Sequence, residues 1–324
     1  MHDLTRFHAV PDRPGYDRYS IEIASPELPC GASWLANCLI ELGVPAWKPW
    51  GSDDATHWAT DDDGSHRYVG GDNGWSRLLP ALRDGRTLRF RAGACVRVHH
   101  VWPGVYPAAA RRVLFVRDPC DALYSGWRRH LARDESASDF PAYCGSAHFH
   151  YPLSRLDYLR VFLRTWRRET EHTDVRVVRF EDYRTDALAT LASTMAWLGL
   201  AATPAELART VDASSIARVK AEDRRLHRLG VVDATLVRGE PPGESARKLD
   251  AATVAWLRDE FADVRAWLGY ADEPPPAREG DACDDALHDD VIGALHAAGI
   301  PLAPSDWLAH ALRDALAGVS RTAG

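Results

Sequence analysis

Lysine is the residue that this sequence most clearly lacks, since Lys48, Lys220 and Lys248 are its only lysines while arginine is frequent. The lysine-containing phosphate loop GxxxxGK[ST] is absent, and so is the GxGxxG spacing of a dinucleotide-binding turn. These absences disfavour nucleotide kinases and dehydrogenases, and a P-loop kinase that uses ATP stays only as an alternative.

Cysteine pairs, long apolar runs and an excess of positive charge are also missing. The 6 cysteines form no CxxC motif and no regular framework, no signal peptide is recognisable, and no apolar run is long enough to span a bilayer. We therefore expect a cytoplasmic protein with reduced thiols and no membrane contact. The formal net charge of -7 argues against a broad nucleic-acid surface.

The sequence does contain enough apolar material for a compact enzyme domain. Its 324 residues are 46% hydrophobic and 26% charged, which is typical of a soluble globular chain. Arginine pairs such as Arg111-Arg112 and Arg224-Arg225 recur along it. Most such pairs are solvated helix faces, but some can line an opening for an anionic small molecule.

Residues 112–129, RVLFVRDPCDALYSGWRR, predict a buried strand that delivers an arginine to the start of a helix. Val113–Val116 form a short apolar run, Asp118 can cap the following helix, and Pro119 suits its first turn. Asp121 stands where the acid of a capping box would lie. The pattern therefore predicts a strand, a tight turn and a capped helix.

Two polar residues of this element are spaced to hold an anion. Arg117 ends the strand, and Ser125 lies about two turns into the helix. Ser125 lies one helical turn after Asp121, which belongs to the first turn of the helix. At this spacing the side chains of Arg117 and Ser125 can converge on one anion. This arrangement is the outline of a phosphate site.

Residues 19–43, YSIEIASPELPCGASWLANCLIELG, predict a second anion-binding element. An apolar strand leads into a Pro/Gly/Ser loop and then into an amphipathic helix. The loop amides of Cys30–Ser33, at the helix N-terminus, would cradle a phosphate. Cys30 is also a candidate reactive thiol, because a helix N-terminus lowers the pKa of a thiol; the alternative is a small packed residue.

Together the two elements resemble the cytosolic-type sulfotransferases, which take a sulfuryl group from 3′-phosphoadenosine-5′-phosphosulfate (PAPS). In that family a PKSGTTW loop holds the 5′-phosphosulfate and an RDPxDxxxS element holds the 3′-phosphate. Gly31-Ala32-Ser33-Trp34 is similar to GTTW, with Trp34 at the position that stacks on adenine. Arg117 and Ser125 match the second element residue for residue.

The resemblance continues downstream and covers roughly residues 19 to 270. Residues 175–200 resemble the family's strand, its YED turn with Tyr183, and a helix that ends in FLGL. Two further segments resemble the TSF group and the late RKGxxGDW loop, both of which contact the 3′-phosphate. They are Ser214-Ser215-Ile216, and Arg238-Gly239 followed by Pro242-Gly243-Glu244.

This resemblance implies an α/β fold of P-loop-like sulfotransferase architecture, with a central, mainly parallel sheet flanked by helices. It implies an enzyme that transfers the sulfuryl group of PAPS to a hydroxyl, or less favourably an amine, of a small-molecule acceptor. The nucleotide product would be adenosine 3′,5′-bisphosphate (PAP), and no metal is needed. Many tryptophans and aromatic-rich loops favour a hydrophobic or aromatic acceptor, such as a specialised metabolite.

Two departures from the family pattern concern the phosphate loops. Pro29 stands where the family has the lysine that stabilises the leaving phosphate oxygen, and an unmatched charge there is costly. Lys48, between two tryptophans, is the first candidate to replace it, and Lys248 is the next. Without a replacement, the chain is a catalytically weakened homologue that binds nucleotide as a scaffold. Ser245 replaces the family's late tryptophan, so the packing of that loop is in doubt.

A general base is needed to accept the acceptor's proton. The family takes a histidine from a strand like KTHLP, which residues 97–103, RVHHVWP, resemble. By register His99 matches the catalytic position. His100 is the alternative, and its side chain would point to the opposite face if the segment stays extended.

The chain is expected to form a polar leader (1–18), a sulfotransferase domain (19–272) and a helical extension (273–324). Residues 51–93 are expected to be an irregular, acceptor-shaping insertion with a helix near 75–83, and aromatic residues of 134–152 can supply apolar walls. The extension is a candidate lid, homodimer contact or docking site for a carrier domain that presents the acceptor. Helical patterns cover 153–172, 187–198, 204–210, 251–268, 284–298 and 305–316.

Overall fold

The computed structural model describes most of the predicted domain. The described residues are 20–47, 58–69, 78–82, 86–91, 93–103, 109–133, 139–148, 153–232 and 234–270. The predicted leader, the helical extension with both of its helices, and the candidate cation Lys48 lie outside them.

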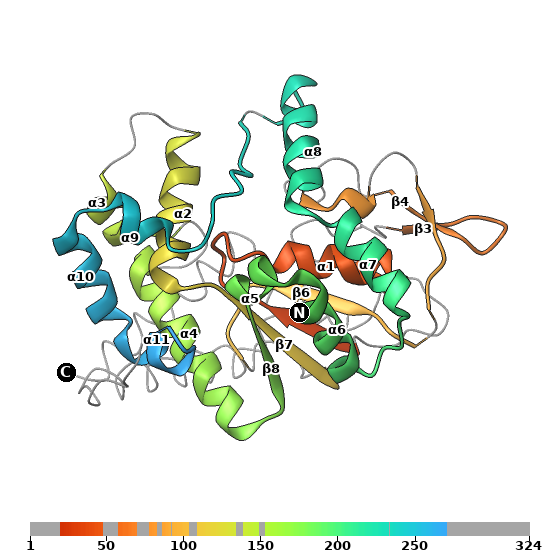
Figure 1. The fold of residues 1–324 in the computed structure, drawn as a ribbon, viewed down its shortest axis with the longest axis horizontal. Coiled ribbons are helices and arrows are strands. Elements are labelled where there is room, and N and C mark those ends of the chain that lie inside the picture. Colours follow the sequence, from red (N-terminus) through yellow and green to blue (C-terminus); the bar gives the residue numbers. More distant parts are fainter. Residues whose placement is uncertain are drawn as a thin grey trace, which may run out of the picture.

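A five-stranded sheet in the order β2-β6-β1-β7-β8 forms the centre of the molecule (Figure 1). Every neighbouring pair in it is parallel, which confirms the predicted fold class. The chain adds β2 and β6 on one side of β1 and then β7 and β8 on the other. The carboxyl end of β1 is therefore a topological switch point, where ligands bind in open α/β sheets. The strands are β1 Ile21–Ala24, β2 Ala46–Trp47, β6 Val96–His99, β7 Arg111–Val116 and β8 Val175–Arg179.

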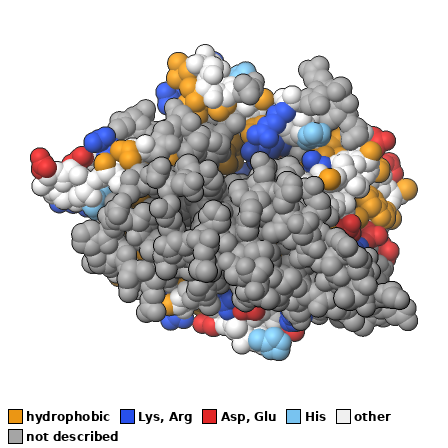
Figure 2. Space-filling model, turned by 180° about the vertical axis from the view of Figure 1, so that it is seen from behind, with side chains coloured by type: hydrophobic (Ala, Val, Ile, Leu, Met, Phe, Trp, Pro, Cys, Tyr) orange, Lys and Arg blue, Asp and Glu red, His pale blue; other side chains and the backbone are white. Residues whose placement is uncertain are grey.

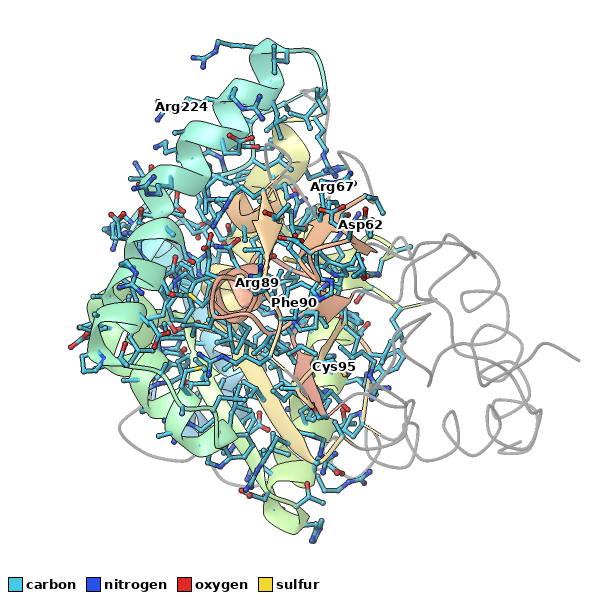
Figure 3. The ribbon with its side chains drawn as sticks, turned by 90° about the vertical axis from the view of Figure 1, so that its right-hand side faces the viewer. Asp62, Arg67, Arg89, Phe90, Cys95 and Arg224 are labelled. Atoms are coloured by element: carbon cyan, nitrogen blue, oxygen red, sulfur yellow. The ribbon has the colours of Figure 1, made fainter. Side chains whose placement is uncertain are left out.

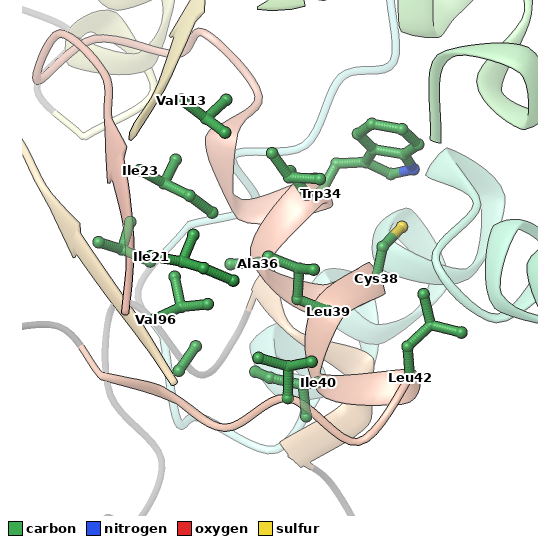
Figure 4. Close-up of a cluster of buried hydrophobic side chains, with 14 of the residues drawn as sticks. Ile21, Ile23, Trp34, Ala36, Cys38, Leu39, Ile40, Leu42, Val96 and Val113 are labelled. Atoms are coloured by element: carbon green, nitrogen blue, oxygen red, sulfur yellow. The ribbon is translucent and has the colours of Figure 1, made fainter. Parts of the chain in front are cut away.

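Alternation along the strands sends side chains to two hydrophobic layers. Ile23 and Phe115 face a layer built with α1 (Ala32–Glu41), α6 (Ala187–Leu198) and α7 (Pro204–Ala213), part of which Figure 4 shows. Leu114 faces the other layer, whose helices come from the middle and from the C-terminal end of the described chain. They are α2 Pro119–Leu131, α3 Phe140–Gly145, α4 Arg155–His172, α10 Ala251–Glu260 and α11 Ala262–Trp267.

The helical patterns within residues 153–268 are confirmed with small shifts at their ends. One continuous pattern breaks, since residues 251–268 form α10 and α11 with a junction at Phe261. The expectation of an amphipathic α1 is wrong, because residues 34–40 of that helix are all buried. A helix that lies between a sheet and a further layer needs no polar face. The remaining helices are α5 Phe180–Thr185, α8 Ile216–Arg228 and α9 Glu244–Lys248.

The helix start at α2 follows the prediction only in part. Asp118 caps α2 by accepting a hydrogen bond from the backbone N of Cys120 at 2.9 Å, and Pro119 opens the first turn. Asp121 forms no capping box, because the backbone N of Asp118 donates to Glu181 instead, at 3.2 Å. The Asp121 carboxylate is thereby available for partners outside α2.

The insertion contains regular structure where it is described, so the expectation of an irregular segment is wrong there. β3 (Trp58–Thr60), β4 (His66–Tyr68) and β5 (Thr87–Leu88) form a separate antiparallel sheet, and residues 80–82 form a 3₁₀ turn. Trp58 packs edge-on against Phe90, which Figure 3 places in this unit beside Arg89. No helix among the described residues is long and apolar enough to cross a membrane.

Candidate functional site

The loop between β1 and α1 approaches Phe180 closely at Gly31. Gly31 has a φ of +95°, a conformation that L side chains rarely adopt. A Cβ at Gly31 would lie 2.8 Å from Phe180 Cδ2, so a side chain there also has no room. Gly31 is the N-cap of α1 and provides no side-chain cap, and Ala32 and Ser33 follow it in the first turn. The amides of this turn are the kind of group that binds phosphate at a helix N-terminus.

Arg117 lies against this loop. Its Nη1 donates to the carbonyl of Pro29 at 3.3 Å, and its guanidinium packs over the Phe180 ring at 4.5 Å from the ring centroid. The side chain is buried, and its Nε has no hydrogen-bond partner among the described residues. Burying an unsatisfied N–H of a charged group is costly, so an anionic acceptor is expected at this position.

Ser125 of α2 and Arg238 of the late loop lie next to each other. Nη2 of Arg238 lies 3.4 Å from Ser125 Oγ, and both terminal nitrogens of Arg238 contact the Glu244 carboxylate. Gly239 follows with a φ of +75°, and its carbonyl accepts a hydrogen bond from Arg184 at 3.3 Å. Residues that the sequence separates by more than 100 positions are thus neighbours.

The late loop, residues 238–245, is held to α2 by Asp121. The sequence predicts Asp121 as the acid of a capping box instead. The carboxylate of Asp121 accepts from Gly243 N at 2.6 Å, from Ser245 N at 2.8 Å and from Ser245 Oγ at 2.6 Å. Burial alone would raise the pKa of Asp121, but these hydrogen bonds and the Arg117 charge lower it. Ser245 therefore holds the loop by polar contacts at the position where the family has tryptophan.

The residues Ser214, Ser215 and Ile216 have different surroundings. Ser214 is buried, and its Oγ accepts a hydrogen bond from Asn37 Nδ2 at 2.7 Å, which ties it to α1. Ser215 is the N-cap of α8 without a side-chain cap bond, and Ile216 is the first residue of that helix. Ser214 thus stabilises the position of α1, while Ser215 stays a candidate ligand contact.

Trp34 and Tyr183 pack against each other in the core. Their rings are stacked with centroids 4.4 Å apart, and both side chains are buried. The predicted stack of Trp34 on an adenine would therefore have to form on the ring face opposite Tyr183. Figure 4 shows Trp34 at the start of α1, at the border of the hydrophobic cluster.

His99, which the sequence predicts as the base, is buried and bonded through both ring nitrogens. Its Nε2 lies 2.9 Å from Glu22 Oε1, and its Nδ1 accepts from the backbone N of Val101 at 3.3 Å. Arg97 donates to the other oxygen of Glu22 at 2.8 Å. Because Nδ1 accepts, the proton of neutral His99 is on Nε2 and is donated to Glu22. This buried group links β1 to β6.

His100 has the arrangement expected of a base. Its Nδ1 lies 2.8 Å from the carbonyl oxygen of Ser25. A carbonyl can only accept, so Nδ1 carries the proton and the lone pair is on Nε2. The His100 carbonyl in turn accepts from Tyr158 Oη at 3.0 Å, and Tyr158 Oη accepts from the backbone N of Glu27. His100 is therefore held to the β1–α1 loop, beside the proposed phosphate site.

Of the two candidate cations, Lys248 lies within the described residues and is exposed on α9. Lys220, the remaining lysine, donates to the carbonyl of Arg238 at 2.6 Å. Lys and Arg side chains gather in one area near the top of the face shown in Figure 2.

The thiol of Cys30 in the β1–α1 loop is buried. Burial raises the pKa of Cys30 to about 12, which removes it as a reactive thiol at neutral pH.

The buried cluster of Glu22, Arg97 and His99, called the Glu22 group below, leads to a prediction about stability. Changing Glu22→Gln leaves the charge of Arg97 buried without its counter-ion, which should cost about 3–5 kcal/mol in the free energy of unfolding. The matched control is Asp212→Asn, which removes a pair with Arg218 at the surface and should cost less than about 1 kcal/mol. Urea unfolding followed by circular dichroism measures both, and equal losses would contradict the prediction.

The same group predicts a loss of stability in acid. Burial lowers the pKa of His99 below 6.5, so the unfolded chain binds this proton more readily and stability falls as the pH drops below that value. Burial alone would raise the pKa of Glu22, but His99 and Arg97 together lower it from 4.5 to about 2. Stabilisation by Glu22 is therefore complete above pH 4.5 and is lost toward pH 2, and Glu22→Gln should abolish this second phase.

Comparisons with known proteins give similarity at the level of structure alone. No protein-family model matches the sequence, and no curated protein sequence does. A mouse sulfotransferase complexed with PAP is 15% identical, over 82% of this chain and 88% of that one, with a TM-score of 0.49. Retinol dehydratase, solved with androsterone and inactive cofactor PAP, is 16% identical over 79% and 82%, with a TM-score of 0.48. A sulfotransferase from Alicyclobacillus acidocaldarius is 17% identical over 68% and 99%, with a TM-score of 0.35.

Proposed function

We propose that this protein is a PAPS-dependent sulfotransferase that transfers a sulfuryl group to a hydroxyl of a small-molecule acceptor. The observation that carries the proposal is the position of Arg117. Its buried guanidinium contacts the loop that opens α1, while its Nε has no partner among the described residues. The motif resemblance assigns a phosphate of the donor to this arginine.

The residues fit a nucleotide that carries two separated anionic groups. The first-turn amides of α1 would hold the 5′-phosphosulfate, and Arg117, Ser125, Ser215 and Arg238 would hold the 3′-phosphate, as the resemblance implies. When bound, PAPS supplies an activated sulfuryl group. The protein's contribution is alignment and charge stabilisation, as in phosphoryl transfer.

His100 takes the role of general base in this proposal. Its Nε2 would accept the proton of the acceptor hydroxyl, and the Ser25 carbonyl would hold the imidazole in the required tautomer and orientation. Lys48 and Lys248 stay the candidates to replace the missing loop lysine. Lys48 lies outside the described residues, and Lys248 is exposed on α9.

An aromatic or hydrophobic acceptor is part of the proposal, and it rests on the many tryptophans and aromatic-rich loops of the sequence. We extend the proposal to specialised metabolism, with the acceptor free or carrier-bound. The free cysteines at positions 30, 38, 95, 120 and 144 favour the cytoplasm.

Ligand-dependent stabilisation tests the donor class. PAP should raise the melting temperature more than AMP, because AMP lacks the 3′-phosphate, and ATP with Mg²⁺ should have the smallest effect. The inverse order would favour the P-loop kinase. Single-turnover reactions with labelled PAPS and a panel of phenols and alcohols then separate an enzyme from a scaffold, which would bind PAP without transferring the label.

A further inference from the structure

Glu244 is a buried carboxylate that the reaction itself does not require. Its two oxygens accept from the two terminal nitrogens of Arg238, at 2.7 Å from Nη1 and 2.9 Å from Nη2. Its side chain is 4% exposed, whereas that of Arg238 is 26% exposed. The arginine of this pair therefore reaches the surface of the site, and the carboxylate lies behind it.

The geometry of a guanidinium decides which edge of Arg238 is left for a ligand. A guanidinium offers an end edge, formed by Nη1 and Nη2, and a side edge, formed by Nε and Nη2. Glu244 takes the end edge. The second hydrogen of Nη2 belongs to the side edge, and Nη2 lies 3.4 Å from Ser125 Oγ. The side edge therefore adjoins Ser125 and matches the two oxygens of a phosphate.

Asp121 fixes the backbone on both sides of Glu244. It accepts hydrogen bonds from Gly243 N, from Ser245 N and from Ser245 Oγ. Asp121 and Ser125 lie one turn apart on α2, so the contacts close a ring from α2 through the late loop and back to α2. Figure 1 shows the chain between α8 and α9 running down between α8 and α2 to reach this point.

We propose that Glu244 is a positioning residue that turns the side edge of Arg238 toward the 3′-phosphate of the donor. This inference rests on the proposed function and adds the residue that makes the site selective for a 3′-phosphorylated nucleotide. Glu244 acts through Arg238, and Asp121 holds Glu244 in place. A carboxylate that instead competed with the phosphate for Arg238 would have the opposite effect on affinity.

Calorimetric titration with PAP and with AMP tests the inference in the full chain. Glu244→Ala should lower the affinity for PAP about tenfold, the scale of one charge-assisted contact, and should change the affinity for AMP less than about twofold. Glu244→Gln keeps the size and one acceptor oxygen, so it should give a smaller loss in the same direction. Glu240→Ala is the matched control, because it removes an exposed carboxylate from the same loop, and it should leave both affinities unchanged.

A double-mutant cycle of Glu244→Ala and Arg238→Ala shows whether Glu244 acts by orienting Arg238 or by keeping the loop ordered. If Glu244 acts through Arg238, the variant that lacks both side chains should bind PAP as weakly as Arg238→Ala alone. Additive losses, equal losses for PAP and AMP, or tighter PAP binding by Glu244→Ala would each overturn the inference. A wild-type protein that does not bind PAP at all would overturn the proposed function itself, which keeps the two failures distinct.

Discussion

Replacing His100 by alanine should reduce kcat by about 10²- to 10⁴-fold, which is the usual contribution of a general base. The Ser25 carbonyl holds its Nδ1–H, so the proton acceptor Nε2 is lost with the ring. Affinity for PAP should stay close to that of the wild type, because the anion contacts come from other residues. Single-turnover kinetics with labelled PAPS and calorimetric titration with PAP measure the two effects.

His99→Ala provides the contrasting variant. His99 is bonded through both ring nitrogens within the Glu22 group, so its loss should lower the midpoint of urea unfolding. The kcat of the folded fraction should change only a few-fold. If His100→Ala kept its turnover while His99→Ala lost it, the assignment of the base would have to be reversed.

Arg117→Ala should weaken PAP binding by about 10- to 150-fold, the range of a hydrogen bond to a charged group. The reason is its location, since this guanidinium is buried against the phosphate loop and rests on the Phe180 ring. Arg117→Lys should recover only part of the loss, because an ammonium group cannot reproduce the planar fork of arginine. Calorimetric titration with PAP gives each affinity.

The control for Arg117 is Arg224→Ala. Arg224 is an exposed arginine on α8 that Figure 3 shows projecting from the molecule, so its removal changes the net charge equally without touching the site. It should leave PAP affinity within twofold of the wild type. An Arg117→Ala protein that is folded by circular dichroism and binds PAP normally would remove Arg117 from the donor site.

The sequence by itself determined the local structure around the site. The apolar run before Arg117 formed β7, Asp118 capped α2, and the helical pattern over 187–198 matched α6 at both ends. Periodicity and capping are properties of residues close together in the chain, so they can be read before any fold is known. The parallel sheet was implied by the family resemblance, and it agrees with a chain in which strands alternate with helices.

Only the tertiary structure decided which partners the polar side chains found. Asp121 was expected to close a capping box within four residues, but it bonds Ser245, which lies 124 positions away. His99 and His100 are neighbours in the chain, but Glu22 lies beside the ring of one and the Ser25 carbonyl beside the ring of the other. A buried carboxylate or imidazole takes the partner that the packing of distant strands brings to it, and short-range sequence patterns carry no information about that partner.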